Sequence, residues 1–200
     1  MASHTRERIM DVALQLFAEK GVAAVPITSI EAGAGLSAGS GSFYRHFKDK
    51  MELLSAVVDR ELIRVRKDPN AQVSKAPPDI PPAEALAIQL RADFDFLRDL
   101  LPLIAILMWE KGRAPNLARR VHETMNERGV ELGIADLMLR TPAAPVKEDP
   151  AAAATVMMSA MVGYFLSVEY FGQPPAGVDE DRFTTTLARL LVNTAPDSPG

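Results

Sequence analysis

Apolar residues recur along most of the chain at the spacing of an α-helix. The first such stripe consists of Ile9, Val12, Ala13, Leu16 and Phe17. Gly21 then stands where a helix-ending glycine belongs. No segment alternates apolar and polar residues with a period of two over a useful length, so the pattern predicts an all-α protein without a sheet.

A helix-turn-helix is predicted within the first 48 residues. The first helix ends near Gly21, a second begins at Thr28 with the threonine hydroxyl as its cap, and a third begins near Ser42. Four glycines from residue 33 to residue 41 disfavour a long helix there and predict a turn. Two short helices joined by a glycine-containing turn form the geometry that places the second helix in the major groove of DNA.

Residues suited to DNA contact surround this turn. Small residues at positions 40–42 let the backbone approach the bases, and the Tyr44 phenol has the reach for a phosphate. Lys48 and Lys50 start the next predicted helix, where the helix dipole and free N–H groups also favour a phosphate. The expected DNA-binding residues are Thr28, Ser40, Gly41, Ser42, Tyr44, Arg45, His46, Lys48 and Lys50. The alternative for His46 is a side chain that packs or caps.

The rest of the chain divides into a connecting helix, a loop, a helical body and a tail. Asp49 and Glu52 resemble a capping box for the connecting helix over residues 49–67. Residues 68–82 contain five prolines, which predict a linker or an exposed loop. The body spans residues 83–194, with helices predicted over 83–100, 101–112, 115–140, 150–171 and 179–194, and residues 195–200 form the tail.

Charge and composition exclude several classes of protein. The net charge of the chain is −4, but residues 1–67 carry +2 and the remainder −6, which indicates a mildly basic module on an acidic body. The absence of cysteine excludes disulfides and thiolate metal sites. The three histidines are scattered outside metal-ligand spacing, and no phosphate-binding loop, zinc-protease motif or nucleophile elbow occurs. We therefore expect no enzyme, no metal and no cofactor.

Residues 151–168 carry no charge and are a candidate for a membrane-spanning helix. Their number lies at the lower edge for a membrane span, polar and small residues dilute them, and no Lys/Arg cluster flanks them. A helix buried on two faces is the preferred interpretation. Charges also interrupt the apolar positions at the N-terminus, which argues against a secretory signal. We expect a cytoplasmic protein without a membrane partner.

The N-terminal region resembles the TetR family of transcriptional regulators. The resemblance covers about a quarter of the chain and rests on Arg8–Gly21 (RIMDVALQLFAEKG), Thr28, Ala34-Gly35, Gly41–Phe47 (GSFYRHF), Lys50 and Leu53-Leu54. Gly35 stands farther from Tyr44 than is usual in the family, so the turn is long and glycine-rich. The resemblance implies a homodimer whose N-terminal domain, residues 1–48, reads a palindromic operator in double-stranded DNA. It also implies a C-terminal domain, residues 83–194, for ligand binding and dimerisation.

The resemblance further implies a small-molecule pocket in the C-terminal domain. Large apolar side chains on its predicted helices are the candidates, and methionine suits an adaptable pocket. The candidate pocket residues are Phe94, Leu97, Leu101, Ile104, Met108, Trp109, Met125, Met158, Met161 and Phe165. The alternative is that these side chains simply fill the core. Glu110 is either a polar anchor for the ligand or a surface carboxylate.

A dimer interface is expected on the last two long helices, as two helices from each protomer in a four-helix arrangement. Small residues on the 150–171 helix would permit close approach of the helices. The candidate interface residues are Ala152, Ala160, Gly163, Phe183, Leu187, Leu190 and Leu191.

The expected function is that of a repressor released from its operator by a small, largely apolar ligand. One alternative is a regulator that needs its ligand as co-repressor, or an activator. Another is a helical small-molecule-binding protein without DNA binding, for which the irregular glycine-rich turn is the supporting feature. Salt-sensitive, sequence-selective DNA binding distinguishes the regulators from that last class.

Overall fold

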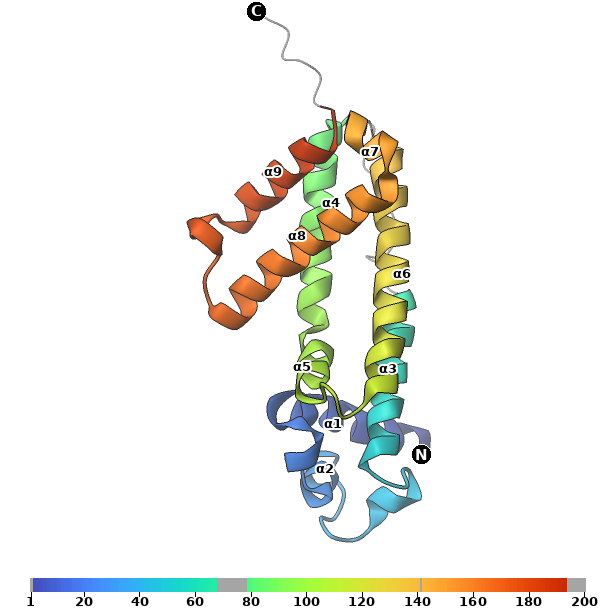
Figure 1. Cartoon of the computed structure of the whole chain (residues 1–200). Helices are drawn as coiled ribbons and strands as arrows, with labels where there is room; N and C mark the ends of the chain where they lie inside the picture. Colours follow the sequence, from blue (N-terminus) through green and yellow to red (C-terminus); the bar gives the residue numbers. More distant parts are fainter. Residues whose placement is uncertain (1, 68–78, 141, 194–200) are drawn as a thin grey trace, which may run out of the picture. The chain divides into compact units, whose positions relative to one another are not determined.

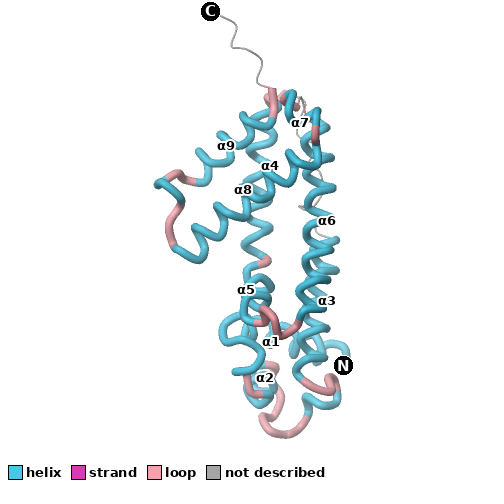
Figure 2. The backbone as a smooth tube through the Cα atoms, viewed as in Figure 1, coloured by secondary structure: helices cyan, strands magenta, loops and turns pink. Residues whose placement is uncertain are grey.

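The fold was analysed in a computed structural model, which describes residues 2–67, 79–140 and 142–193. Two compact units divide the chain. The N-terminal unit contains residues 1–67 and 99–124, and the C-terminal unit contains residues 68–98 and 125–200. Helices joined by turns make up both units, and no strand occurs among the described residues (Figure 2).

The N-terminal unit contains both long helices and short ones (Figure 1). They are α1 (Ala2–Ala24), α2 (Ile27–Gly33), the 3₁₀ helix η1 (Ser42–Arg45), α3 (Lys50–Lys67), α5 (Leu101–Trp109) and the first part of α6 (Pro115–Leu139). The predicted stripe on α1 faces inward, since Ile9, Ala13 and Phe17 are fully buried. Phe43 and Phe47 are buried as well, so three aromatic side chains anchor the core of this unit.

The end of α1 is held by side chains from two other helices. Gly21 bends α1, because its φ of 73° and ψ of 155° are not helical. The Trp109 indole N–H donates to the Ala18 carbonyl oxygen at 3.0 Å, and a Cβ on Gly21 would meet the indole ring at 3.4 Å. The Lys50 ammonium donates to the carbonyl oxygens of Val22 and Val25 at 2.7 and 2.9 Å. These contacts satisfy backbone groups that the bend removes from the helix.

Ion pairs connect the longer helices of this unit. Arg60 on α3 pairs with Glu7 and Asp11 on α1, at 3.3 and 2.7 Å. Arg120 on α6 pairs with Asp59 on α3. The long, buried apolar face of α3 therefore sits between two helices that also engage its polar edges.

The C-terminal unit is built from longer helices. They are α4 (Pro82–Asp99), the second part of α6, α7 (Ala144–Glu148), α8 (Pro150–Phe171), the 3₁₀ helix η3 (Pro175–Gly177) and α9 (Glu180–Leu191). Asp149 caps α8 by accepting the Ala152 N–H at 3.0 Å, and Asp179 caps α9 by accepting the Arg182 N–H at 2.8 Å. Gly172, in the left-handed conformation, ends α8 and lets the chain return along α9 (Figure 1).

Aromatic and ionic contacts join α4, α8 and α9. Tyr164 stacks on Phe183 with ring centroids 4.3 Å apart, and Phe94 lies 5.4 Å from Tyr164. Arg98 on α4 pairs with Glu180 on α9 and, at 3.6 Å, with Glu169 on α8. The three helices thus pack against one another within the C-terminal unit.

The structure confirms the all-α prediction and modifies two of its details. The body predicted over residues 83–194 is divided, because residues 99–124 pack with the N-terminal residues. The chargeless helix was expected to be buried on two faces, one of them against a partner protomer; in the single chain α8 is buried on one face, and Val156 and Val162 on its other face are exposed. The helix expected from residue 179 ends at Leu191, and the loop at 68–78 and the tail lie outside the described residues.

Gly21→Ala is expected to lower the melting temperature Tm. Only glycine readily adopts the φ and ψ of Gly21, so alanine there costs about 1–3 kcal/mol of unfolding free energy. Gly172→Ala is the control, because its φ of 71° and ψ of 9° lie in the left-handed helical region, which other residues adopt at lower cost. Calorimetric melting should show the larger loss for Gly21→Ala; equal losses would contradict a special backbone requirement at the bend.

Candidate nucleic-acid interface

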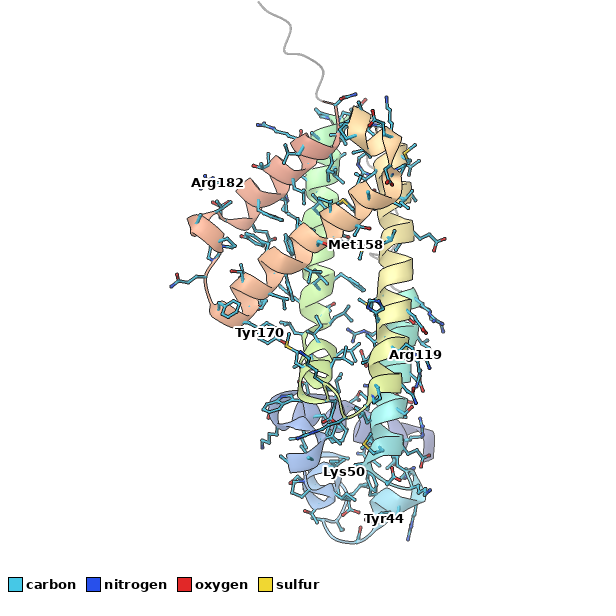
Figure 3. The ribbon with its side chains drawn as sticks, viewed as in Figure 1. Tyr44, Lys50, Arg119, Met158, Tyr170 and Arg182 are labelled. Atoms are coloured by element: carbon cyan, nitrogen blue, oxygen red, sulfur yellow. The ribbon has the colours of Figure 1, made fainter. Side chains whose placement is uncertain are left out.

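The third segment of the predicted helix-turn-helix is the single 3₁₀ turn η1. Phe43 points into the core, whereas Tyr44 is 60% exposed and Arg45 is exposed. Tyr44 lies at the tip of the N-terminal unit (Figure 3) and rests edge-on against Phe43, with ring centroids 5.3 Å apart. The buried ring therefore fixes the backbone from which the two polar side chains project to solvent.

A buried carboxylate organises the glycine-rich turn that precedes η1. Glu31 on α2 is 1% exposed. Its two carboxylate oxygens accept the N–H of Gly39 at 2.7 Å and the N–H of Phe43 at 3.0 Å. Charge-assisted bonds of this kind are stronger than neutral ones, and they satisfy a carboxylate that would be costly to bury alone. Glu31 thereby fixes the distance between α2 and η1.

The remaining small polar residues of the candidate set have local partners. Ser40 and Ser42 share a hydrogen bond between their hydroxyls at 2.7 Å on the exposed face of the turn. His46 is partly buried and exposes less than its neighbour Arg45. Thr28 does not cap α2 as predicted, because α2 begins one residue earlier and its cap position is Pro26, which makes no side-chain hydrogen bond. Thr28 instead lies exposed in the first turn of α2.

Lys48 and Lys50 occupy different environments. Lys48 is exposed at the entrance to α3. Lys50 was expected to hold a phosphate, but its three N–H bonds are directed at three backbone carbonyl oxygens, those of Val22, Val25 and, at 3.1 Å, Ala23. The structure therefore assigns the Lys50 ammonium to the end of α1 and leaves the Lys48 ammonium beside Tyr44.

The start of α3 was also expected to offer free N–H groups to a phosphate. Asp49 accepts the Glu52 N–H at 2.8 Å, and Glu52 accepts the Lys48 N–H at 2.7 Å. The predicted capping box is thus present, and it places two carboxylates at this helix end. Their negative charge weakens the attraction of the helix dipole for a phosphate.

An open concavity of about 700 Å³ lies beside Tyr44 within the N-terminal unit. Its lining residues are Val22, Ala23, Ile27, Tyr44, Lys48, Asp49, Lys50, Met51, Glu110 and Arg113. Glu110, for which the sequence left a ligand anchor and a surface carboxylate open, is not a surface carboxylate. It is buried, and its carboxylate accepts the Val22 N–H at 3.3 Å because α5 packs against the end of α1. The exposed Arg113 adds a cation near Lys48 that sequence reasoning missed.

The structure divides the candidate pocket residues between the two units. Leu101, Ile104, Met108 and Trp109 belong to the N-terminal unit, and Phe94, Leu97, Met125, Met158, Met161 and Phe165 belong to the C-terminal unit. Met108 and Trp109 are half exposed, and the Trp109 ring lies over Gly21, so these two side chains are not part of the buried core. Phe94, Met161 and Phe165 are buried in the core of the C-terminal unit. Met158 on α8 (Figure 3) lies against Gly129 on α6.

The candidate interface residues also fall into two groups. Leu187 and Leu191 are buried within the protomer, and Phe183 stacks on Tyr164, so these three side chains do not form free surface. The α9 stripe faces its own chain because α4 and α8 cover it. Ala152 and Gly163 on α8 and Leu190 on α9 are exposed, and Ala160 is partly exposed.

Comparison with known proteins agrees with the helix-turn-helix geometry. Residues 9–57, which include α2, the turn and η1, match the family of bacterial regulatory proteins named after TetR. The N-terminal segment of the chain is therefore a TetR-family helix-turn-helix region. A TetR-family structure from Mesorhizobium loti MAFF303099 has the same fold, with a TM-score of 0.72 and 20% identity over 95% of this chain and 96% of that one. The SmeT–triclosan complex matches with a TM-score of 0.66 and 21% identity, over 98% and 95% of the two chains.

A curated relative is similar at the level of sequence. The uncharacterized HTH-type transcriptional regulator YerO of Bacillus subtilis (strain 168) is 36% identical over 106 residues. The match spans 52% of this chain but only 35% of the length of YerO. The HTH-type regulator AcrR of Shigella flexneri is 43% identical over 56 residues, which are 28% of this chain and 25% of AcrR.

Glu31 is, besides Arg113, a residue of this site that the sequence did not predict. The only signal is a lone carboxylate between Ile30 and Ala32, immediately before the glycine-rich turn. Surface glutamates are common at such places, so the pattern alone does not separate a solvated carboxylate from one that accepts two backbone N–H groups.

Glu31→Gln is expected to loosen the turn. The amide retains one acceptor and directs an N–H toward a backbone N–H, so about 1–3 kcal/mol of local stability is lost. Amide hydrogen exchange at Gly39 and Phe43 should accelerate, while the exposed control Glu19→Gln leaves both unchanged. Unchanged protection in Glu31→Gln would show that the carboxylate does not hold the turn.

Proposed function

We propose that this chain is a TetR-family DNA-binding transcriptional regulator, and that it acts as a homodimeric repressor. One observation carries the proposal: Tyr44 and Arg45 project to solvent from a turn that Glu31 and the buried Phe43 hold in place. Each protomer would present η1 to a major groove, with Tyr44 and Lys48 on phosphates and Ser40 and Ser42 near the base edges. A palindromic operator would match the symmetry of the dimer.

Dimerisation is supported by the exposed face of α8. Ala152, Val156 and Gly163 lie on this face, and Leu190 on α9 is 71% exposed. An apolar face of this kind is buried when two copies pair, and small residues let two helices approach closely. Two copies also double the phosphate contacts, which a module of net charge +2 requires for useful affinity.

Release by a small ligand is the regulatory part of the proposal. SmeT was solved with triclosan, and we propose that this chain likewise binds a small effector in its C-terminal domain. Within the N-terminal unit, α5 contacts the end of α1 through Trp109 and Glu110. A ligand that favours another position of α5 would shift the population of protomers whose η1 is set for DNA.

We place the protein in the cytoplasm, where its DNA is. Among the described residues, α8 is the one helix with the length and composition to cross a membrane. The same composition suits a helix whose exposed face is covered by a second copy. The dimer therefore accounts for this apolar surface.

Selection from a random duplex library by the purified full-length protein tests the proposal. An enriched inverted repeat is expected, with half-sites about one helical turn apart and salt-sensitive affinity. No enrichment by a folded dimer would reject the repressor. Repeating the selection with a small-molecule extract would then separate a regulator that needs a co-repressor from a protein without DNA binding.

Lys48→Ala and Lys50→Met are expected to have opposite effects. Lys48→Ala should reduce the slope of log affinity against log salt by about 0.9, as for one lost phosphate contact, and leave Tm unchanged. Lys50→Met should lower Tm, because three carbonyl oxygens lose their donor, and leave the slope nearly unchanged. Fluorescence anisotropy across salt and calorimetry measure the two quantities; the reverse assignment would mean that Lys50 is the phosphate ligand.

A further inference from the structure

A polar cluster lies inside the C-terminal unit, between α4 and α6. Gln89 and Asp93 contribute from α4, Asp136 from α6, and Arg140 from the residue that follows α6. The Arg140 side chain is only 6% exposed. Its Nη1 donates to the Asp136 carbonyl oxygen at 2.8 Å and to the Asp136 carboxylate. An arginine buried to this extent ordinarily has partners for all of its N–H groups.

The other edge of the Arg140 guanidinium has no partner. Nε and Nη2 are both buried, and neither donates a hydrogen bond. The N–H bonds of these two atoms point to the same side of the planar group and form the fork that donates two parallel hydrogen bonds to a carboxylate. Leaving such donors buried and unpaired costs about 1–3 kcal/mol each, so the edge is a place where a bound acceptor would be strongly favoured.

The missing group is an acceptor. Asp93 accepts the Gln89 amide N–H at 2.9 Å, and Asp136 accepts from Arg140, so the carboxylates of the cluster already have donors. Among the described residues, the one other buried side-chain N or O atom without a partner is Arg8 Nε, in the N-terminal unit. Burial raises the pKa of Asp93 to about 6 and raises that of Asp136. Asp136 therefore needs its contact with Nη1, and only the Nε–Nη2 edge is available to a ligand.

We propose that the Nε–Nη2 edge of Arg140 binds the carboxylate of a small organic acid. The neighbouring turns of α4 and α6 bury Leu86, Leu90 and Leu137, which favours an acid with an apolar body. That the acid acts as the effector rests on the proposed function. Its binding to Arg140 does not require DNA and is measured without it.

The test uses full-length protein and paired probes. Benzoate and octanoate are compared with benzamide and octanamide, which have the same bodies without the charge. Inorganic phosphate and octylamine test for a general anion or cation site. A carboxylate is expected to raise Tm and to bind in calorimetry at least about tenfold more tightly than its amide, in line with the loss of charged hydrogen bonds. Equal responses to phosphate or octylamine, or no response to either acid, would overturn the proposal.

The variant Arg140→Lys tests whether the Nε–Nη2 edge, and not the positive charge alone, binds the acid. Lysine keeps the positive charge near Asp136 and removes the fork, so affinity for the acids should fall roughly tenfold to a hundredfold. Arg182→Lys is the matched control, since Arg182 is exposed on α9 (Figure 3) and should leave affinity unchanged. Undiminished binding by a folded Arg140→Lys would refute the assignment.

A direct measurement covers the case in which Arg140→Lys does not fold. A crystal structure of the wild-type protein with octanoate should show the carboxylate on Nε and Nη2, and a carboxylate bound elsewhere would refute the site. The experiments contradict the proposed function and the proposed acid site by different outcomes. Acid binding without operator selection rejects the regulator alone, and operator selection without acid binding rejects this site alone.

Discussion

The N-terminal unit depends on how the end of α1 is stabilised. Gly21 turns the chain out of the helix, which leaves the carbonyl oxygens of the following residues without their helical partners. A single ammonium, from Lys50, supplies donors to three of them. Glu110 accepts the Val22 N–H from the other side, and Trp109 covers the bend. Three helices therefore meet at a few backbone groups, and the position of α2 follows from them.

In the candidate interface, the residues that stabilise the fold differ from those that are free to contact DNA. Lys50 and Glu31 are charged residues near the proposed DNA surface, but the structure directs both at the protein backbone. Tyr44, Arg45 and Lys48 remain with side chains exposed to solvent. A residue type alone does not distinguish the two roles, because an ammonium binds a phosphate oxygen and a carbonyl oxygen by the same chemistry.

The sequence predicted the elements of the fold well where periodicity decides them. Stripes such as Ile9, Ala13 and Phe17 located helices, and the helix predicted over residues 150–171 coincides with α8. The periodicity did not predict which other helix each apolar stripe packs against. Phe183, Leu187 and Leu191 show the spacing of an interface and of a core equally well, and they pack on their own chain. Trp109 belongs to an apolar helix, but its ring covers Gly21. Tertiary packing determines this contact, and the position of Trp109 along its helix does not predict it.

The buried polar groups carry information that periodicity lacks. Glu31, Glu110 and Lys50 are each oriented by backbone partners, so their charges serve the fold itself. Arg140 differs from them, since one edge of its guanidinium is paired with Asp136 and the other edge faces no acceptor. Folding alone does not favour a buried donor pair in that state, because an apolar side chain of similar volume would avoid its cost. A bound molecule that accepts hydrogen bonds from Nε and Nη2 of Arg140 would remove this cost. The planar fork favours a molecule with two adjacent acceptor oxygens.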